Sequence, residues 1–406
     1  MANKTVLILG GGVGGIVTAN TLRELLGAEH RVIVVDKQSE YVFTPSLLWV
    51  MVGWRQPAQI SKDLHRLVQS GVEVVLADVQ EIDLGGQKVM TSSGDLAYDY
   101  LVLALGATLA PQATPGFDEA AITPYDLDGA TRLWSVLQRF EGGRVAVLVA
   151  GMPYKCPAAP YETALLLDDH LRRRGIRGRC KVEVFTPEVL PMGVAGPAMG
   201  QAVVGMLEAK GIRFNPNLDL THIDPERNEL VFSSREPAPF DLLAGVPPHR
   251  PPQVVQQSTL ANETGWVPVN RRTLQTSHEN VYAIGDVTAV TLANGKPLPK
   301  AAVFAEGQAR AVARSIADEV QGIGAQAEFD GVGFCWIETG GGSAGFASGE
   351  FYAEPDPVVP LPHSGRMWHW GKILFEKYWM REGVTRGVSR LLLNLGSKVL
   401  NIPASL

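Results

Sequence analysis

Thr5–Leu9 (TVLIL) runs directly into Gly10–Gly15 (GGGVGG), and this junction decides the fold. The first part is a short apolar strand pattern, and Ile16–Leu26 reads as the helix that follows. Three glycines have the spacing G-x-G-x-x-G: Gly10, Gly12 and Gly15. Such glycines let backbone N–H groups at a helix N-terminus approach a pyrophosphate. A second strand, Arg31–Val35, ends in Asp36, where a carboxylate binds a ribose hydroxyl. Together these features predict a dinucleotide-binding α/β domain.

Three later segments specify FAD as the dinucleotide. Tyr98–Gly106 (YDYLVLALG) is an acid followed by an apolar strand and a glycine, and Phe240–Pro248 repeats this pattern more loosely. Gly265–Asp286 places a strand before Gly285 and Asp286. The glycine allows close approach of the backbone, and the aspartate suits ribityl hydroxyls or a phosphate-bound water. The candidate FAD contacts are Gly10, Gly12, Gly15, Asp36, Gly106, Gly285 and Asp286.

With the N-terminal motif, these segments resemble the FAD/NAD-linked disulfide reductase family over most of the chain. The resemblance implies an α/β fold with two Rossmann-like domains and a C-terminal helical segment. It also implies that the FAD domain is split, at about residues 1–112 and 240–330. The second Rossmann-like domain is then expected at 113–239, and the C-terminal segment at 331–406.

Composition sets ordinary bounds. The 406 residues provide room for two or three domains, and the net charge of −6 does not indicate nucleic acid as a partner. The three cysteines are too few and too scattered for a secreted disulfide framework, and the histidines lack metal-ligand spacing, so no metal site is expected. The first strand begins at Thr5, so no secretory leader is expected. No apolar run reaches the ~18 residues of a membrane-spanning helix.

A Pro-rich turn stands where a second dinucleotide loop is expected. Gly151–Glu162 (GMPYKCPAAPYE) follows the apolar strand Arg144–Ala150 and offers one glycine where a nicotinamide loop needs several. Pro153 also removes a backbone donor. The turn instead carries Cys156 and Glu162. We therefore expect no useful oxidation of NADH and a substrate that a thiol or disulfide can engage.

Three segments resemble the sulfide:quinone oxidoreductases and the related flavin subunit of flavocytochrome c sulfide dehydrogenase: Tyr154–Glu162, Phe334–Trp336 and Trp370–Tyr378. This resemblance implies that Cys156 and Cys335 form a redox pair beside the flavin. It further implies oxidation of sulfide to sulfur or polysulfide, with electrons passing through FAD to a membrane quinone.

The chain departs from many quinone-linked members in one respect. They carry a third cysteine in the segment after the first FAD half, and Ala120–Asp128 has none. The remaining thiol, Cys180, opens the strand Lys181–Phe185, and we interpret it as structural. The redox site thus leans toward the flavocytochrome-like subgroup, which leaves the acceptor undecided.

Among the other candidate residues, Glu162 and Lys300 each have two interpretations, and Thr44 and Ser46 have one. Glu162 is a base for removing a proton from sulfide or a persulfide, or a carboxylate stabilised at the N-terminus of the helix Thr163–Arg173. The resemblance implies that Lys300 lies near the flavin pyrimidine ring. The alternative is that Lys300 is a solvated loop lysine. Thr44 and Ser46 resemble the family's flavin-contacting turn.

The C-terminus bears on the electron acceptor. Aromatic residues gather near a helix expected at Lys372–Arg381, and the helix Val384–Leu400 combines leucines with basic residues. This combination suits a helix lying in a membrane surface. Phe375 and Tyr378 are the candidates for a quinone slot. The alternative is ordinary docking of a C-terminal helix on the core.

The sequence predicts a peripheral protein of the cell membrane that uses sulfide and quinone, and a homo-oligomer is left open. One alternative is the flavin subunit of a sulfide dehydrogenase with a cytochrome c acceptor. Another is a type II NADH:quinone oxidoreductase, which shares the FAD motifs but needs a nicotinamide loop and no cysteine pair. A non-enzymatic flavin sensor would need only the FAD motifs and would show no turnover.

Overall fold

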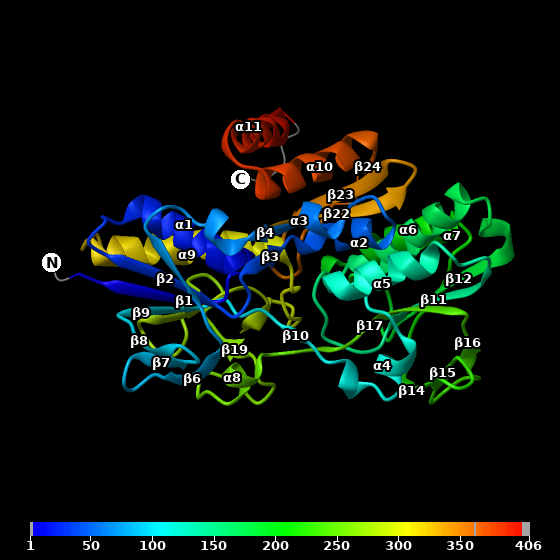
Figure 1. The fold of residues 1–406 in the computed structure, drawn as a ribbon, viewed down its shortest axis with the longest axis horizontal. Helices are drawn as coiled ribbons and strands as arrows, with labels where there is room; N and C mark the ends of the chain where they lie inside the picture. The colour runs from blue at the N-terminus through cyan, green and yellow to red at the C-terminus, as the bar shows by residue number, and fades with distance from the viewer. Residues whose placement is uncertain (1–2, 361–362, 400–406) are drawn as a thin grey trace.

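A computed structural model of the chain describes residues 3–360 and 363–399. Two α/β units lie side by side, and a C-terminal segment covers the junction between them (Figure 1). The fold class expected from the sequence is confirmed: two Rossmann-like units and a helical C-terminal segment. Within the described residues, no helix is long and apolar enough to cross a membrane.

The first unit is built on a parallel five-stranded sheet in the order β20-β9-β1-β2-β5. The strands are β1 (Thr5–Leu9), β2 (Arg31–Asp36), β5 (Val72–Leu76), β9 (Tyr100–Leu103) and β20 (Val281–Ala283). Every residue of β9 and β20 is buried, as expected where both faces of a parallel sheet are covered. Helices α1 (Val13–Leu25) and α9 (Ala302–Val320) cover one face (Figure 1).

The second unit has a parallel four-stranded sheet in the order β13-β12-β11-β17. Its strands are β11 (Gly143–Val149), β12 (Cys180–Phe185), β13 (Arg213–Asn215) and β17 (Leu242–Val246). Helices α5 (Leu127–Leu137), α6 (Ala159–Arg173) and α7 (Pro197–Glu208) lie on one side of this sheet. On the other side lie α4 (Phe117–Ala120), β14 (Leu220–Asp224), β15 (Glu229–Phe232) and β16 (Ala238–Pro239) (Figure 1).

Smaller elements complete the first unit and link it to the second. The links pair as antiparallel strands, β10 (Thr108–Leu109) with β18 (His249–Arg250), so the two chain crossings lie together. The domain boundaries themselves stay a prediction. The other elements are β3 (Glu40–Val42), α2 (Leu47–Met51), α3 (Pro57–Ile60), β4 (Ser61–Asp63), β6 (Val79–Asp83), β7 (Lys88–Thr91), β8 (Gly94–Ala97), α8 (Gln253–Gln256), β19 (Val267–Pro268) and β21 (Thr288–Ala289).

The C-terminal segment is an antiparallel sheet followed by two helices. The strands are β22 (Val332–Gly340), β23 (Ser343–Glu350) and β24 (His363–Gly365). Helix α10 (Arg366–Met380) begins six residues earlier than the expected start at Lys372. Helix α11 (Gly383–Val399) matches the second expected helix to within a residue at each end, and Leu400 lies outside the described residues. Figure 1 shows α10 lying across β22 and β23, with α11 outermost.

Candidate active site

One large cavity of about 1350 Å³ lies where the two units and the C-terminal segment meet. Predicted site residues from all three parts line it: Gly10, Gly12, Asp36, Thr44, Gly106, Cys156, Glu162, Gly285, Asp286, Lys300, Cys335 and Phe375. Because these residues are far apart in the chain, their meeting in one cavity is a property of the tertiary fold.

Three predicted residues do not line this cavity: Gly15, Ser46 and Tyr378. Gly15 lies under the loop, where an added Cβ would overlap the carbonyl oxygen of Gly10. Ser46 is buried at the end of a 3₁₀ turn, Thr44–Ser46, that places Thr44 rather than Ser46 in the lining. Tyr378 is buried against Trp379, at 6.1 Å between ring centroids. The expected quinone pair is therefore divided, with Phe375 alone in the cavity wall.

The N-terminal loop fits a dinucleotide. Gly10 has φ of 106°, and a Cβ there would overlap the carbonyl of Ala104. Asp36 holds the loop, because its carboxylate accepts the Gly11 N–H at 2.5 Å. Gly12 is the N-cap of α1 and provides no side-chain cap, so the first N–H groups of the helix have no capping side chain and suit a phosphate.

Cys156 lies in the wall of the cavity with φ of 53°, in the left-handed region that few non-glycine residues adopt. Its N–H donates to the carbonyl of Lys300 at 2.7 Å, and its own carbonyl accepts the Ala159 N–H at 2.9 Å. The residue is exposed and lines the cavity, and protein atoms are dense around its sulfur. Burial raises the pKa of this thiol to about 11, and the Glu162 carboxylate adds to that effect.

Cys335 comes from a different part of the chain, on β22, and is half-buried in the same cavity. Burial raises the pKa of its thiol well above the usual value, and the charges of Cys156 and Glu162 raise it further. Lys372 acts in the opposite direction on both thiols. The two cysteines are free thiols in this structure, and each responds electrostatically to the same charged pair.

That charged pair is Glu162 with Lys372, a buried ion pair between α6 and α10. The residues are only 3% and 6% exposed, and both line the cavity. Burial raises the pKa of Glu162 to about 7, although Lys372 opposes the shift. Burial lowers the pKa of Lys372, but Glu162 and Glu338 outweigh it, so the pKa is raised overall. Glu162 lies in the first turn of α6, as one reading of the sequence expected, but it also has a buried partner.

Sequence reasoning missed Lys372, Glu338 and His369 as site residues. Glu338 is 0% exposed on β22, and both of its carboxylate oxygens lie 2.9 Å from Nδ1 of His369. His369 and Lys372 are one turn apart on α10. The only signal was a lysine and a histidine at helical spacing among aromatic residues, which does not indicate a carboxylate partner by itself.

Lys300 is not a solvated loop lysine. Its Nζ donates to the carbonyls of Asp286 at 2.6 Å and Thr288 at 3.2 Å, and it lies 3.5 Å from the ring centroid of Trp266. Burial lowers the pKa of Lys300 to about 8, with Asp286 opposing the shift. Burial likewise raises the pKa of Asp286. The lysine therefore anchors the cavity wall that also holds the backbone of Cys156.

Comparison with known proteins places this geometry in a family. A sequence model described as pyridine nucleotide-disulphide oxidoreductase matches residues 4–309. The chain belongs to this family. It is 30% identical to the sulfide-quinone reductase of Aquifex aeolicus (strain VF5), across 93% of this chain and 90% of that protein. It is 26% identical to the mitochondrial sulfide:quinone oxidoreductase of Mus musculus, across 88% of this chain and 81% of that protein.

A solved structure agrees with the sequence relatives. The X-ray structure of the sulfide:quinone oxidoreductase from Aquifex aeolicus has a TM-score of 0.85 and 27% identity, and the match covers 99% of this chain and 96% of that one. As a member of the pyridine nucleotide-disulphide oxidoreductase family, the chain is a flavin-dependent oxidoreductase, and its cofactor is FAD. The fit of the Gly10–Gly15 loop to a dinucleotide agrees with this.

The acidic residue that follows β12 in the second Rossmann-like unit is engaged by side chains of the protein itself. Glu188 follows β12, near the position where such domains use an acid for a ribose hydroxyl. Here its carboxylate accepts three hydroxyl groups of the protein itself: Tyr154 at 2.7 Å, Thr186 at 3.2 Å, and Tyr161. Burial raises the pKa of Glu188. The acid is thus already satisfied by its own unit.

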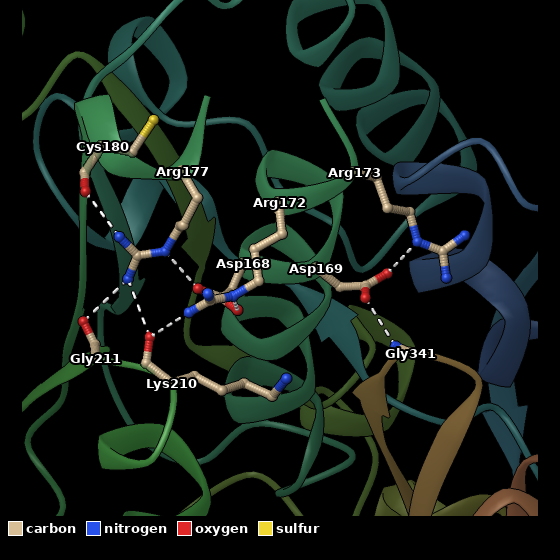
Figure 2. Close-up of polar contacts among 9 residues, drawn as sticks. All are labelled: Asp168, Asp169, Arg172, Arg173, Arg177, Cys180, Lys210, Gly211 and Gly341. Atoms are coloured by element: carbon tan, nitrogen blue, oxygen red, sulfur yellow. Dashed lines mark hydrogen bonds and ion pairs between the residues drawn. The ribbon is translucent and has the colours of Figure 1, made fainter. Parts of the chain in front are cut away.

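Cys180 lies apart from the cavity. Its Sγ donates to the carbonyl of Ile176 at 3.3 Å, and its carbonyl accepts from Arg177 at 2.8 Å. Figure 2 shows Arg177 also reaching the carbonyls of Lys210 and Gly211 and the carboxylate of Asp168. This network ties the start of β12 to α6 and to the end of α7, which agrees with a structural role for Cys180.

Proposed function

We propose that this chain is a sulfide:quinone oxidoreductase that oxidises sulfide at Cys156 and Cys335 and passes the electrons to a membrane quinone. The observation that carries the proposal is that two thiols from separate segments line one cavity with the Gly10–Gly15 loop. A buried Glu162–Lys372 pair lies beside them. The names of the relatives support the same reaction class.

The proposed chemistry begins with a sulfur bridge between the two cysteines. Hydrosulfide attacks one bridge sulfur, a new S–S bond forms, and the other cysteine leaves as a thiolate. Lys372 stabilises that thiolate, because its charge lowers the pKa of both thiols. Glu162 accepts the proton of the resulting persulfide. The persulfide and the thiolate would then be oxidised to a bridge longer by one sulfur, with the two electrons leaving through bound FAD, and repeated turns would lengthen the bridge until it leaves as polysulfide.

FAD would be held by the Gly10–Gly15 loop, Asp36, Gly106, Gly285 and Asp286, with Thr44 and Lys300 in the same wall. When bound, it supplies the two-electron chemistry that links thiol oxidation to quinone reduction. Lys300 places a cation in that wall, and its lowered pKa of about 8 means that the charge is lost at alkaline pH.

We place the quinone beside Phe375, on the face of α10 that points into the cavity. Phe375 lies 5.9 Å from Phe43 and 5.3 Å from Trp336 between ring centroids. An aromatic wall of this kind suits a flat apolar ring. A route from lipid is provided by α11, whose exposed leucines would lie in the membrane surface.

Anaerobic titration tests the proposal. Sulfide should bleach the flavin absorbance, and a soluble quinone added afterwards should restore it. NADH at micromolar concentration should leave the flavin oxidised, because the turn at Gly151–Glu162 lacks a phosphate loop and Glu188 is occupied by tyrosines. Bleaching by NADH and not by sulfide would favour the NADH:quinone alternative. Reoxidation by cytochrome c but not by quinone would favour the sulfide dehydrogenase alternative.

A further inference from the structure

A second, smaller pocket of about 240 Å³ opens beside α10, at His369 and Ile373. It is lined by Trp49, Trp54, Arg55, Arg173 and His369, with Gly342 and Ile373. His369 is half-buried, so its ring reaches this pocket while its Nδ1 faces Glu338. The large cavity ends at Glu162 and Lys372, and the small pocket begins at His369.

Four titratable side chains join the two openings. Glu162 contacts Lys372 as a buried ion pair, and the backbone N–H of Glu338 also favours the Glu162 carboxylate. Lys372 interacts electrostatically with Glu338. The Glu338 carboxylate lies 2.9 Å from Nδ1 of His369. Three of the four are at least nine-tenths buried, and the fourth faces the pocket.

Aromatic side chains line this row of four titratable groups. Nζ of Lys372 lies 5.1 Å from the ring centroid of Trp49. The His369 ring lies 6.2 Å from Trp49 and 5.9 Å from Trp54 between centroids. Indole rings thus line the space between the charged groups. Among the described contacts no direct hydrogen bond or ion pair joins Lys372 to Glu338, so a bridging water would carry the proton across that step.

The other charged groups at the small pocket already have partners. Arg55 pairs with Glu376 at 2.8 Å and lies 4.7 Å from the Trp49 ring. Arg173 pairs with Asp169 at 2.6 Å. Among the described residues lining the pocket, His369 is thus the one that contacts the buried Glu338 carboxylate, and its imidazole can carry a proton on either ring nitrogen.

We propose that Glu162, Lys372, Glu338 and His369 form a proton path from the sulfur cavity to solvent at the small pocket. The proposal rests on the proposed function. Oxidation of one hydrosulfide to the level of elemental sulfur releases two electrons and one proton. The electrons leave for the quinone by way of the bound flavin, and the proton leaves the persulfide for Glu162.

From Glu162 the proton passes to Lys372 as Lys372 gives one, through a bridging water, to Glu338. Glu338 then protonates Nδ1 of His369, and the imidazolium releases a proton to water in the pocket. Each N–H or O–H bond that breaks is replaced by one that forms, so the four groups return to their starting charge. The pKa of Glu162, about 7 through burial, suits a group that accepts and releases a proton near neutral pH.

The test uses the FAD-loaded full chain in stopped flow, in weak buffer with a pH indicator dye. Flavin bleaching by sulfide and proton release are followed together, without quinone. In the wild type the proton should appear in step with bleaching. His369→Ala should slow both by on the order of 100-fold, and imidazole should restore them because the pocket opens to solvent beside the missing ring. Glu338→Gln, which keeps the shape but loses the acid, should be slow and insensitive to imidazole.

Ile373→Val is the matched control, because Ile373 lines the same pocket and the change removes no titratable group. It should release the proton at the wild-type rate. Proton release by His369→Ala as fast as the wild type would overturn the path. So would a slow His369→Ala enzyme that imidazole leaves slow. If the wild-type flavin is not bleached by sulfide at all, the proposed function itself is wrong, so the two failures are distinguishable.

Discussion

Cys156 has a backbone conformation that cysteine seldom adopts, and the surrounding hydrogen bonds account for it. Its φ of 53° is fixed from both sides, by the Lys300 carbonyl and by the Ala159 N–H. Strained conformations of this kind persist where the surroundings determine them, and they cluster at functional sites. Here the conformation places a thiol in the cavity wall opposite one contributed by β22.

We predict that Cys156 and Cys335 act as one unit. Cys156→Ser and Cys335→Ser should each abolish most sulfide:quinone turnover, and the double variant should be hardly worse, because groups that act together are not additive. Cys180→Ser is the control and should keep near-normal rates, since its sulfur contacts Ile176 outside the cavity. Dithionite should still reduce the flavin of the inactive variants. Near wild-type turnover by Cys335→Ser would break the two-cysteine mechanism.

Glu162 gives a prediction about pH. Its pKa of about 7 means that the carboxylate is protonated at lower pH, so a base at this position is lost as the pH falls. The ratio of the wild-type to the Glu162→Gln rate of flavin bleaching should rise with pH and level off above about pH 7, reaching on the order of 100-fold. The ratio is used because sulfide itself titrates in this range.

Glu376→Gln serves as the control for that profile. Like Glu162, Glu376 is buried, but it lies on α10, pairs with Arg55 and does not line the large cavity. Its wild-type-to-variant ratio should be constant across the pH range. A constant ratio for Glu162→Gln as well would exclude Glu162 as the base.

Sequence reasoning reached the residues that local motifs mark, and missed those that only tertiary contacts define. Cys156 and Glu162 stand in one turn, and Cys335 followed from the resemblance. Lys372, Glu338 and His369 become a set only when α10 lies across β22. Tyr378 was expected in the quinone slot with Phe375, three residues before it. It packs instead against Trp379 and does not line the cavity.

At the scale of elements, contacts between α6 and the β22–β23 hairpin fix the positions of the two thiols relative to each other. Figure 2 shows Asp169 of α6 between Arg173 and the turn of the hairpin. Its carboxylate accepts the Gly341 N–H at 2.7 Å and pairs with Arg173 at 2.6 Å. Gly340 packs so closely that an added Cβ would lie 2.6 Å from Cβ of Asp169. This contact fixes Cys335 on β22 relative to the start of α6.

We predict different effects for two neighbouring aspartates. Asp169→Asn should lower the sulfide oxidation rate severalfold, because the hairpin that carries Cys335 loses its tie, and should cost about 1 kcal/mol of unfolding free energy. Asp168→Asn should cost more, about 3 kcal/mol, because the 0%-exposed Asp168 carboxylate holds Arg172 and Arg177. In its folded fraction, however, Asp168→Asn should keep the wild-type rate. Urea unfolding and rates normalised to bound flavin check both, and equal rates for the two variants would contradict the hairpin argument.

Element types were predicted better than their ends. Helix α6 begins at Ala159, four residues before the expected Thr163, and Pro160 in its first turn was a start signal that the sequence already carried. The start of α10 at Arg366 carried no such signal, because the aromatic run Trp368–Trp370 does not favour helix over strand locally. Packing on β22 and β23 decides it.

At the scale of the molecule, both Rossmann-like units contribute residues to one cavity. The first provides the Gly10–Gly15 loop, while the second presents Cys156 from the turn after β11 and keeps its acid, Glu188, bound to tyrosines. The repeated βαβ pattern made this architecture readable from sequence. The position of α10 and α11 over the junction could not be predicted from the sequence, because it depends on contacts between units (Figure 1).

The outermost helix carries the last prediction. Leu391, Leu392 and Leu395 of α11 are 58%, 47% and 50% exposed, an apolar face with no covering partner among the described residues. Replacing all three by serine should weaken binding to phospholipid vesicles by on the order of 100-fold, because each leucine, about half exposed in the protein, would contribute about 1 kcal/mol on entering the membrane. Turnover with a quinone held in vesicles should fall with it, while turnover with a soluble short-chain quinone should remain.

Leu76→Ser with Val189→Ser is the matched control, since these side chains are 46% and 68% exposed on the two Rossmann-like units. That variant should bind vesicles as the wild type does. Vesicle flotation and the two quinone assays decide the matter together, because an anchoring helix affects delivery of an apolar quinone and leaves the sulfur chemistry intact. Unchanged flotation of the triple α11 variant would mean that its leucines face another protein surface, and the electron acceptor would then have to arrive by a route other than lipid.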